Sequence, residues 1–355
     1  MNVFKDLIVV ELASVLAGPA VGMFFRELGA KVIKIENKVT GGDVTRKWKL
    51  PSENAALPYS AYYCSVNWKK ETHFLDLTQE EDRQITYEFI RTADIVISNF
   101  KPASAKKLGM SYEQLKTINE QLIFGLITGY GEANPAPAFD VVMQAETGFL
   151  YMCGEPDGPS VKMPVALIDL LAAHQLKAGI LTAMIRKMKT GIGSKVSVSL
   201  YDAAVASLAN QATNWLMAGH IPEKMGTQHP NIAPYGTTFK TKDGKEIVLA
   251  IGTDRQFQLL CKVLGATTIA NDEQFQTNKL RVRNRIALNA ALLVSFLEVG
   301  GDILGTLKAA GVPCADIRNM KQVFEDKLTN DLILTEAMEA GQISKRVKTV
   351  VFKLD

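Results

Sequence analysis

The chain has 355 residues, 47% of them apolar, and its 40 Lys and Arg nearly balance its 37 Asp and Glu. This length predicts two domains or one large one, and a net charge of +3 excludes nucleic-acid binding driven by bulk charge. The four cysteines lie far apart and form no C-x-x-C pair, which predicts reduced thiols and a cytoplasmic protein. We expect no membrane partner.

The first 36 residues predict a strand, a helix and a parallel strand. Residues 7–11 are a short apolar run typical of a buried strand. We expect a turn at 17–20, a helix at 21–28 and a strand at 31–36. The pattern continues with helices at 86–92 and 112–119 and strands at 94–98 and 122–128, which predicts a parallel α/β sheet. Although residues 7–25 are apolar enough for a membrane span, Glu11 and Gly18-Pro19 favour a folded unit.

The second half predicts a long buried helix and then a smaller domain. Residues 164–189 are apolar all round, which is typical of a core helix, and a strand at 195–200 and a helix at 201–217 follow. The Gly/Pro/His-rich stretch 219–234 is typical of a linker. We expect a hairpin after it, with its turn at Asp243-Gly244. We therefore predict an α/β protein. Its parts are a Rossmann-like large domain (1–218, completed by 330–355), a linker (219–234) and a small α+β domain (235–325).

Several familiar sites are missing from the sequence. The turn after the first strand has a single glycine, Gly18, where a dinucleotide-binding loop needs three. The four histidines show no metal-ligand spacing, so we expect no metal. Neither a nucleophile elbow nor a phosphate-binding loop is present.

Asp169 is the candidate for chemistry. Every residue within four positions of it is apolar, so its carboxylate is desolvated unless something offsets that cost. The start of a helix offers amides and a positive dipole. From the residues alone two interpretations stay open, a reactive carboxylate and, with better odds, an N-cap aspartate.

Segments spread over nearly the whole chain resemble the class III CoA-transferases. This family includes the formyl-CoA and carnitine CoA-transferases and is related to α-methylacyl-CoA racemase. The order and spacing of the segments carry the resemblance. They are 16–19 (LAGP), 42–46 (GDVTR), 93–102 (ADIVISNFKP), 127–131 (ITGYG), Phe139-Asp140, 189–202 (KTGIGSKVSVSLYD) and 229–235 (HPNIAPY).

The resemblance implies a reaction and an assembly. Asp169 would be the nucleophile that attacks an acyl-CoA thioester, forming first an anhydride and then an aspartyl-CoA thioester. CoA would pass from an acyl-CoA donor to a small carboxylic acid. No tightly bound cofactor is expected, since CoA is a substrate. The resemblance also implies a homodimer of two interlocked rings, with linkers near 219–234 and 324–334.

The resemblance further implies the residues that contact CoA and the acyl group. The expected CoA contacts are Val15, Asn37, Lys38, Lys69, Asn99, Lys107, Leu108 and Tyr130. The expected acyl pocket is formed by Arg46, Trp48 and Tyr59.

Two alternatives stay open at this point. One is an acyl-CoA racemase or epimerase, and the other is a CoA-binding protein without transfer activity. Phe139 stands where the racemase relatives have a histidine. One of two proton-transfer groups is therefore missing, which favours transfer.

Overall fold

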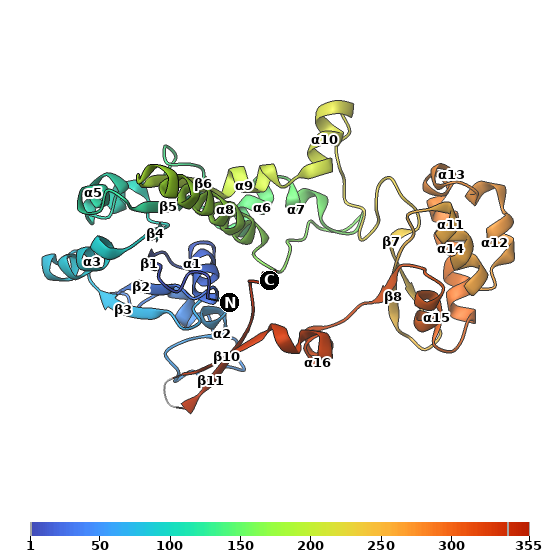
Figure 1. The fold of residues 1–355 in the computed structure, drawn as a ribbon. Helices are drawn as coiled ribbons and strands as arrows, with labels where there is room; N and C mark the ends of the chain where they lie inside the picture. Colours follow the sequence, from blue (N-terminus) through green and yellow to red (C-terminus); the bar gives the residue numbers. More distant parts are fainter. Residues whose placement is uncertain (1, 339–340, 355) are drawn as a thin grey trace. The chain divides into compact units, whose positions relative to one another are not determined.

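The computed structural model describes residues 2–338 and 341–354. The chain divides into two compact units (Figure 1). Unit 1 consists of Met1–Leu150, Lys162–Ile221 and Leu328–Asp355, and unit 2 of Tyr151–Val161 and Pro222–Lys327.

Unit 1 is built on a six-stranded sheet in which all neighbouring strands are parallel. This confirms the predicted parallel α/β sheet. The strand order β3-β2-β1-β4-β5-β6 is that of doubly wound dinucleotide-binding folds. The sequence did not indicate β3, because this edge strand is short, polar and only partly buried. The strands are β1 (Ile8–Leu12), β2 (Lys31–Asn37), β3 (Glu71–Leu75), β4 (Ile95–Ser98), β5 (Ile123–Thr128) and β6 (Ser194–Ser199).

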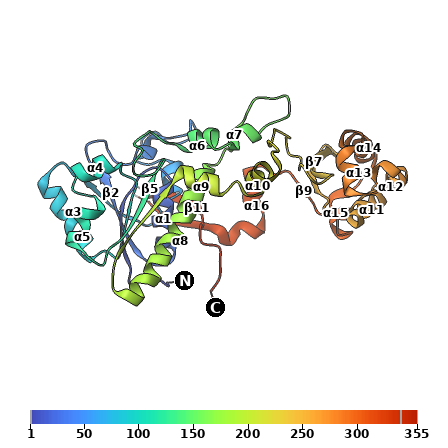
Figure 2. The same cartoon turned by 90° about the horizontal axis from the view of Figure 1, so that it is seen from above.

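Helices cover both faces of this sheet (Figure 2). Because successive strand side chains point to opposite faces, Val9 packs in the layer with α1 and α8, whereas Val10 packs with α3 and α5. Because the central strands are buried on both faces, their sequences are nearly continuous apolar runs. These helices are α1 (Ala17–Glu27), α3 (Glu80–Thr92), α5 (Tyr112–Ile118) and α8 (Leu167–Thr190). The shorter ones are η1 (Val44–Lys47), α2 (Ala61–Cys64), α4 (Pro102–Lys107), α6 (Asp140–Glu146), α7 (Phe149–Met152), α9 (Leu200–Ala206) and α10 (Ala209–Ala218).

Two sequence predictions about helices were wrong. Residues 17–20 are not a turn, since α1 begins at Ala17 and Pro19 lies in the first turn, where a missing N–H leaves no helical hydrogen bond unmade. Residues 201–217 are not one helix. The chain breaks at Ser207 and Leu208, between α9 and α10. Ala209, the first residue of α10, has φ of +47°, a value that the interior of an α-helix does not adopt.

By length and composition alone α8 could cross a membrane, as could α14 (Arg285–Glu298) with α15 (Ile303–Ala309) if that bent pair is counted as one span. In unit 1, however, α8 packs on β5 and β6. Its Ile168, Leu176 and Ile180 are fully buried. It is thus the core helix that its composition predicted.

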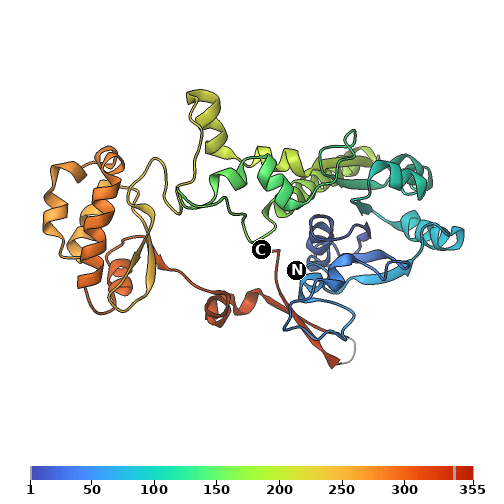
Figure 3. The same cartoon turned by 180° about the vertical axis from the view of Figure 1, so that it is seen from behind.

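Unit 2 has a three-stranded antiparallel sheet, β7-β8-β9, with helices packed on it (Figure 3). The predicted hairpin is confirmed, because β7 and β8 pair antiparallel on either side of Gly244. Phe257, Leu288 and Phe296 are the centre of its core. Its elements are β7 (Tyr235–Lys240), β8 (Glu246–Ala250), α11 (Asp254–Val263), α12 (Thr267–Asn271), η2 (Glu273–Phe275), α13 (Asn278–Arg283), α14, α15, β9 (Cys314–Asp316) and α16 (Met320–Glu325).

After η3 (Lys327–Leu332), the C-terminal hairpin of β10 (Ile333–Ala337) and β11 (Ile343–Val347) returns to unit 1 beside α2. Glu27 of α1 holds it. The carboxylate forms a buried ion pair with Arg346 and accepts the backbone N–H groups of Thr349 at 3.0 Å and Val350 at 2.8 Å. The Glu27 side chain therefore links residues 346–350 to helix α1.

Glu27→Gln should destabilise unit 1 by about 3 kcal/mol, because removing one partner leaves the Arg346 guanidinium buried without its counter-charge. Urea unfolding gives the free energy, and hydrogen exchange at the Thr349 and Val350 amides locates the loss. The control is Glu88→Gln, whose ion pair with Arg91 is exposed and should change stability by less than about 1 kcal/mol. Equal effects of the two variants would contradict this account of the hairpin.

Candidate active site

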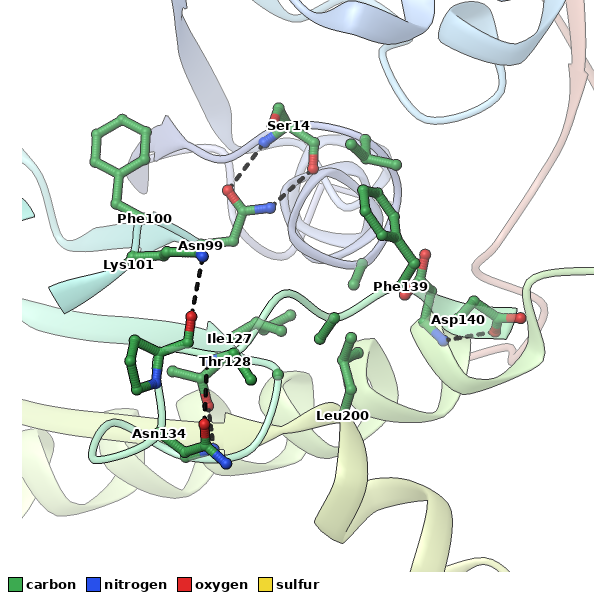
Figure 4. Close-up of a pocket in the computed structure, with 18 of the residues that line it drawn as sticks. Ser14, Asn99, Phe100, Lys101, Ile127, Thr128, Asn134, Phe139, Asp140 and Leu200 are labelled. Carbon is green, nitrogen blue, oxygen red and sulfur yellow. Dashed lines mark hydrogen bonds between the residues drawn. The ribbon is translucent and has the colours of Figure 1, made fainter. Parts of the chain in front are cut away.

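A cavity of about 210 Å³ lies at the carboxyl ends of β1, β4, β5 and β6 (Figure 4). In doubly wound sheets ligands bind outside these ends, where the strand order reverses, and here that point lies between β1 and β4. We call it the Asp169 cavity. It is lined by Ser14–Ala17, Asn99–Pro102, Ile127–Gly129, Gly131, Asn134–Ala136, Ala138–Asp140, Asp169 and Leu200.

Asp169 is the third residue of α8 and is only 9% exposed. Its N-cap interpretation was wrong, because the N-cap position is Ala166. Instead the carboxylate of Asp140, from α6, accepts the backbone N–H groups of Ile168 at 2.7 Å and Asp169 at 3.4 Å. The Asp169 carboxylate makes no hydrogen bond to any of the described residues. It is therefore a buried acid whose helix is capped by another residue.

The surroundings of Asp169 favour its neutral form. Burial, and after it the charge of Asp140, raises the pKa of Asp169 to about 7. The same charges act on Tyr62, whose pKa is raised to about 12 by burial and then by Asp169 and Asp140. A carboxylate that ionises near neutral pH and lacks a fixed partner is suited to nucleophilic or proton-transfer chemistry.

The turn after β1 forms another wall of the cavity and is held in place by hydrogen bonds. Asn99 accepts the N–H of Ser14 at 3.2 Å and donates to its carbonyl at 2.9 Å (Figure 4). The next residue, Val15, has φ of +71°, and its N–H donates to Asp43 at 3.1 Å. The backbone on this side of the cavity is thus fixed at both residues.

A second cavity of about 420 Å³ lies at the carboxyl ends of β1, β2 and β3. We call it the Asn37 cavity. It shares Ser14 and Phe100 with the Asp169 cavity. Together they follow the edge of the sheet on both sides of β1, which suits a long ligand with a reactive end.

The structure places the sequence-predicted residues in three groups. Val15, Asn99 and Asp169 line the Asp169 cavity, and Asn37 and Leu108 line the Asn37 cavity. The remaining predicted residues lie outside both linings. These are Lys38, Lys69, Lys107, Tyr130, Arg46, Trp48 and Tyr59.

Two predicted basic residues already have partners in the fold. The Arg46 guanidinium donates to Glu36 at 2.6 and 3.0 Å and lies 3.9 Å from the centre of the Tyr63 ring. Lys69 donates its N–H to Glu336 of the C-terminal hairpin, and its ammonium lies over the Trp68 ring. Of the other predicted residues, Tyr130 packs against Tyr201, Trp48 against Tyr62, and Tyr59 in a small buried cluster with Tyr63 and Cys64.

Most residues of the Asp169 cavity lining were not predicted as site residues. Among them are Asp140, Phe100 and Lys101, which belong to segments that carry the family resemblance. The signal for Asp140 was an acidic residue at a helix start, just after an extended segment. Within residues 2–338 and 341–354, no group of three or more His, Cys, Asp or Glu side chains is placed to hold a metal ion.

The sequence was compared with protein families and known proteins. The family model for CoA-transferase family III matches residues 4–355. A succinate–glutarate CoA-transferase of Agrobacterium fabrum is 37% identical over 97% of this chain and 87% of its own length. A human succinyl-CoA:glutarate CoA-transferase is 34% identical over 95% of this chain and 77% of its own length.

A solved structure is similar over nearly the whole chain. The crystal structure of a CAIB/BAIF family protein from Brucella suis has a TM-score of 0.86 at 36% identity, covering 99% of this chain and 92% of that one. The family match spans nearly all of the chain, and so does this structural match. The chain belongs to CoA-transferase family III.

Proposed function

We propose that this CoA-transferase moves CoA from an acyl-CoA to a carboxylic acid through covalent intermediates on Asp169. The observation that carries the proposal is the Asp169 carboxylate itself. It is buried in the cavity and has no hydrogen-bond partner among the described residues, while Asp140 satisfies the amides at the start of its helix. Burial without a partner leaves a carboxylate reactive toward a carbonyl carbon.

The first half of the reaction loads CoA onto the protein. A carboxylate oxygen of Asp169 attacks the thioester carbonyl, the C–S bond breaks, and the acyl group is joined to Asp169 as a mixed anhydride. The CoA thiolate then attacks the aspartyl carbonyl. The donor acid leaves with the bridging oxygen, and Asp169 becomes a CoA thioester.

The second half runs the same steps with the acceptor acid. Its carboxylate attacks the aspartyl thioester and releases CoA thiolate, which forms a new anhydride. The thiolate attacks the acceptor's carbonyl, and the bridging oxygen stays with Asp169 as its carboxylate is restored. Splitting one transfer into such steps lowers each barrier.

The two adjoining cavities support a path for the CoA molecule. We place its nucleotide end in the Asn37 cavity and its thioester in the Asp169 cavity, past the shared Ser14 and Phe100. Racemisation is disfavoured, because Phe139 lines the Asp169 cavity at the position expected for a second proton-transfer group. Succinyl-CoA with glutarate is the first pair to assay, since both acids appear in the names of relatives.

We also propose that the chain forms an interlocked homodimer, as the family resemblance implies. Exposed apolar side chains in each unit support an interface. In unit 1, α10 exposes Leu216 (79%) and Met217 (83%), and in unit 2, α14 exposes Ile286 (88%). Contiguous exposed apolar surface marks interaction sites, whereas a single exposed residue such as Ile286 is ordinary, so the support comes mainly from α10.

Asp169→Asn should lower kcat for CoA transfer more than about a hundredfold, since the covalent route is lost. Affinity for CoA, measured by calorimetry, should change little, because CoA binds through the rest of the cavities. The matched control is Asp202→Asn on α9, a residue outside both cavity linings, which should keep its activity. A variant at position 169 that retains about a tenth of the activity would rule out the covalent role.

Transfer should also depend on pH. The pKa of Asp169 is raised to about 7 by burial and then by Asp140, so the nucleophilic carboxylate is depleted below that pH. The rate constant kcat/KM should therefore rise with pH through about 7. Asp140→Asn removes the neighbouring charge but keeps a carbonyl acceptor for the α8 amides, so the rise should move to lower pH. An unchanged profile in Asp140→Asn, measured beside Asp202→Asn, would contradict this coupling.

Interlocked subunits cannot exchange without unfolding, so the dimer should resist dilution. Sedimentation should show a dimer at every concentration tested. Tagged and untagged dimers mixed in the native state should form no mixed dimers, whereas refolding them together from urea should. Monomers at low concentration, or mixed dimers without unfolding, would refute the interlocked assembly.

A further inference from the structure

Val15 has an unusual backbone conformation in the wall of the Asp169 cavity. Its φ of +71° lies in the left-handed region, which is costly for a β-branched residue. Such outliers persist only where the surroundings force them, and they gather at functional sites. The residues on both sides of Val15, Ser14 and Leu16, line the same cavity.

Asp43 is the residue that holds this conformation. Its carboxylate accepts the Val15 N–H at 3.1 and 3.4 Å. It also accepts the N–H of Thr45 at 3.0 Å and the Thr45 hydroxyl at 2.8 Å. Asp43 is only 4% exposed. It lines the Asn37 cavity but not the Asp169 cavity, so it acts on the Asp169 cavity through Val15.

A buried charge network fixes Asp43 from behind. The Lys34 ammonium lies 3.3 Å from Asp43, 2.9 Å from Glu11 and 2.7 Å from the Ala13 carbonyl. Glu11 in turn binds Lys70 at 2.8 and 3.0 Å. The Lys34, Glu11, Asp43 and Lys70 side chains are all 0% exposed. Because each charge is fully buried, moving Asp43 would leave Lys34 short of a partner.

On the side facing α1 the network is tightly packed. Gly22 of α1 lies against Glu11, and a Cβ at this position would meet Glu11 Oε2 at 1.9 Å. The chain thus brings β1, β2 and α1 close enough to enclose the charges. Asp43 is therefore held in one place, and the Val15 turn is held with it.

We propose that Asp43 is a positioning residue for the CoA-transfer reaction, holding the Val15 turn in the left-handed conformation that shapes the acyl-CoA site. The inference rests on the proposed function only in placing acyl-CoA in the Asp169 cavity. If the Val15 N–H lost its acceptor, φ would relax to a negative value. The peptide planes on either side would then turn, and the wall of the cavity would change shape.

A double-mutant cycle with glycine at position 15 tests this proposal. Glycine adopts positive φ about as readily as negative φ, so a chain carrying Val15→Gly needs Asp43 less. Asp43→Ala should weaken CoA binding by about tenfold or more when Val15 is present. In the Val15→Gly background the same change should weaken it by about threefold or less. Calorimetry with CoA gives both ratios.

Equal losses in the two backgrounds would overturn the proposal. Neither pairing with Lys34 nor direct contact with CoA in the Asn37 cavity, which Asp43 also lines, depends on the residue at position 15. Asp43→Asn is the milder variant, to be used if Asp43→Ala does not fold. It keeps an oxygen acceptor for the Val15 N–H, so CoA affinity should stay within about threefold in both backgrounds while thermal stability falls. A tenfold loss with Asp43→Asn in both backgrounds would also overturn the proposal.

Measuring CoA binding rather than transfer separates the role of Asp43 from the covalent chemistry proposed for Asp169. CoA binding needs no turnover, so the cycle gives the same answer whether or not Asp169 forms a covalent intermediate. Loss of transfer in Asp169→Asn, in contrast, does not depend on the residue at position 43.

Discussion

The hydrogen bonds from the start of α8 to Asp140 are the interaction on which the rest of the site depends. They satisfy the backbone N–H groups of Ile168 and Asp169, which would otherwise bind the nearest carboxylate. The Asp169 side chain, inside the cavity, is therefore left without a hydrogen bond to any residue that the structure describes. The same Asp140 charge, added to burial, raises the pKa of Asp169 to about 7. One neighbour thus supplies both the geometry and the electrostatics of the proposed nucleophile.

The sheet places these groups where a ligand can reach them. In the sheet, β1 lies between β2 and β4. The loops that follow these strands therefore diverge and leave room at the carboxyl ends. Asn99 and Asp43 fix the turn after β1, and the charges around Lys34 fix Asp43. This wall of the Asp169 cavity is thus held in place, whereas the Asp169 carboxylate has no hydrogen-bond partner in the described part of the chain.

The sequence alone predicted the parallel sheet and singled out Asp169 as a candidate, because both leave local signals, whereas the nucleophile role of Asp169 was implied only by the family resemblance. Apolar runs mark β1, β2, β4 and β5, and a lone acid in an apolar stretch marks Asp169. The Asp140 cap was not predictable in this way, since its partner Ile168 is 28 residues away in the chain. The hydrogen bond between Val15 and Asp43 was not predictable either, since these two residues are also 28 positions apart. Surface lysines such as Lys38 and Lys107 were named from the resemblance and lie outside both cavity linings.

In the proposed route, Asp169 exchanges a carboxylate oxygen with the donor and acceptor acids. The most direct measurement uses an acceptor acid labelled with ¹⁸O in its carboxylate, followed by digestion and mass spectrometry of the peptide that contains Asp169. After a single turnover with succinyl-CoA, we expect one heavy oxygen in Asp169 and none in Asp140 or Asp202. Continued transfer without label in Asp169 would contradict the aspartyl route.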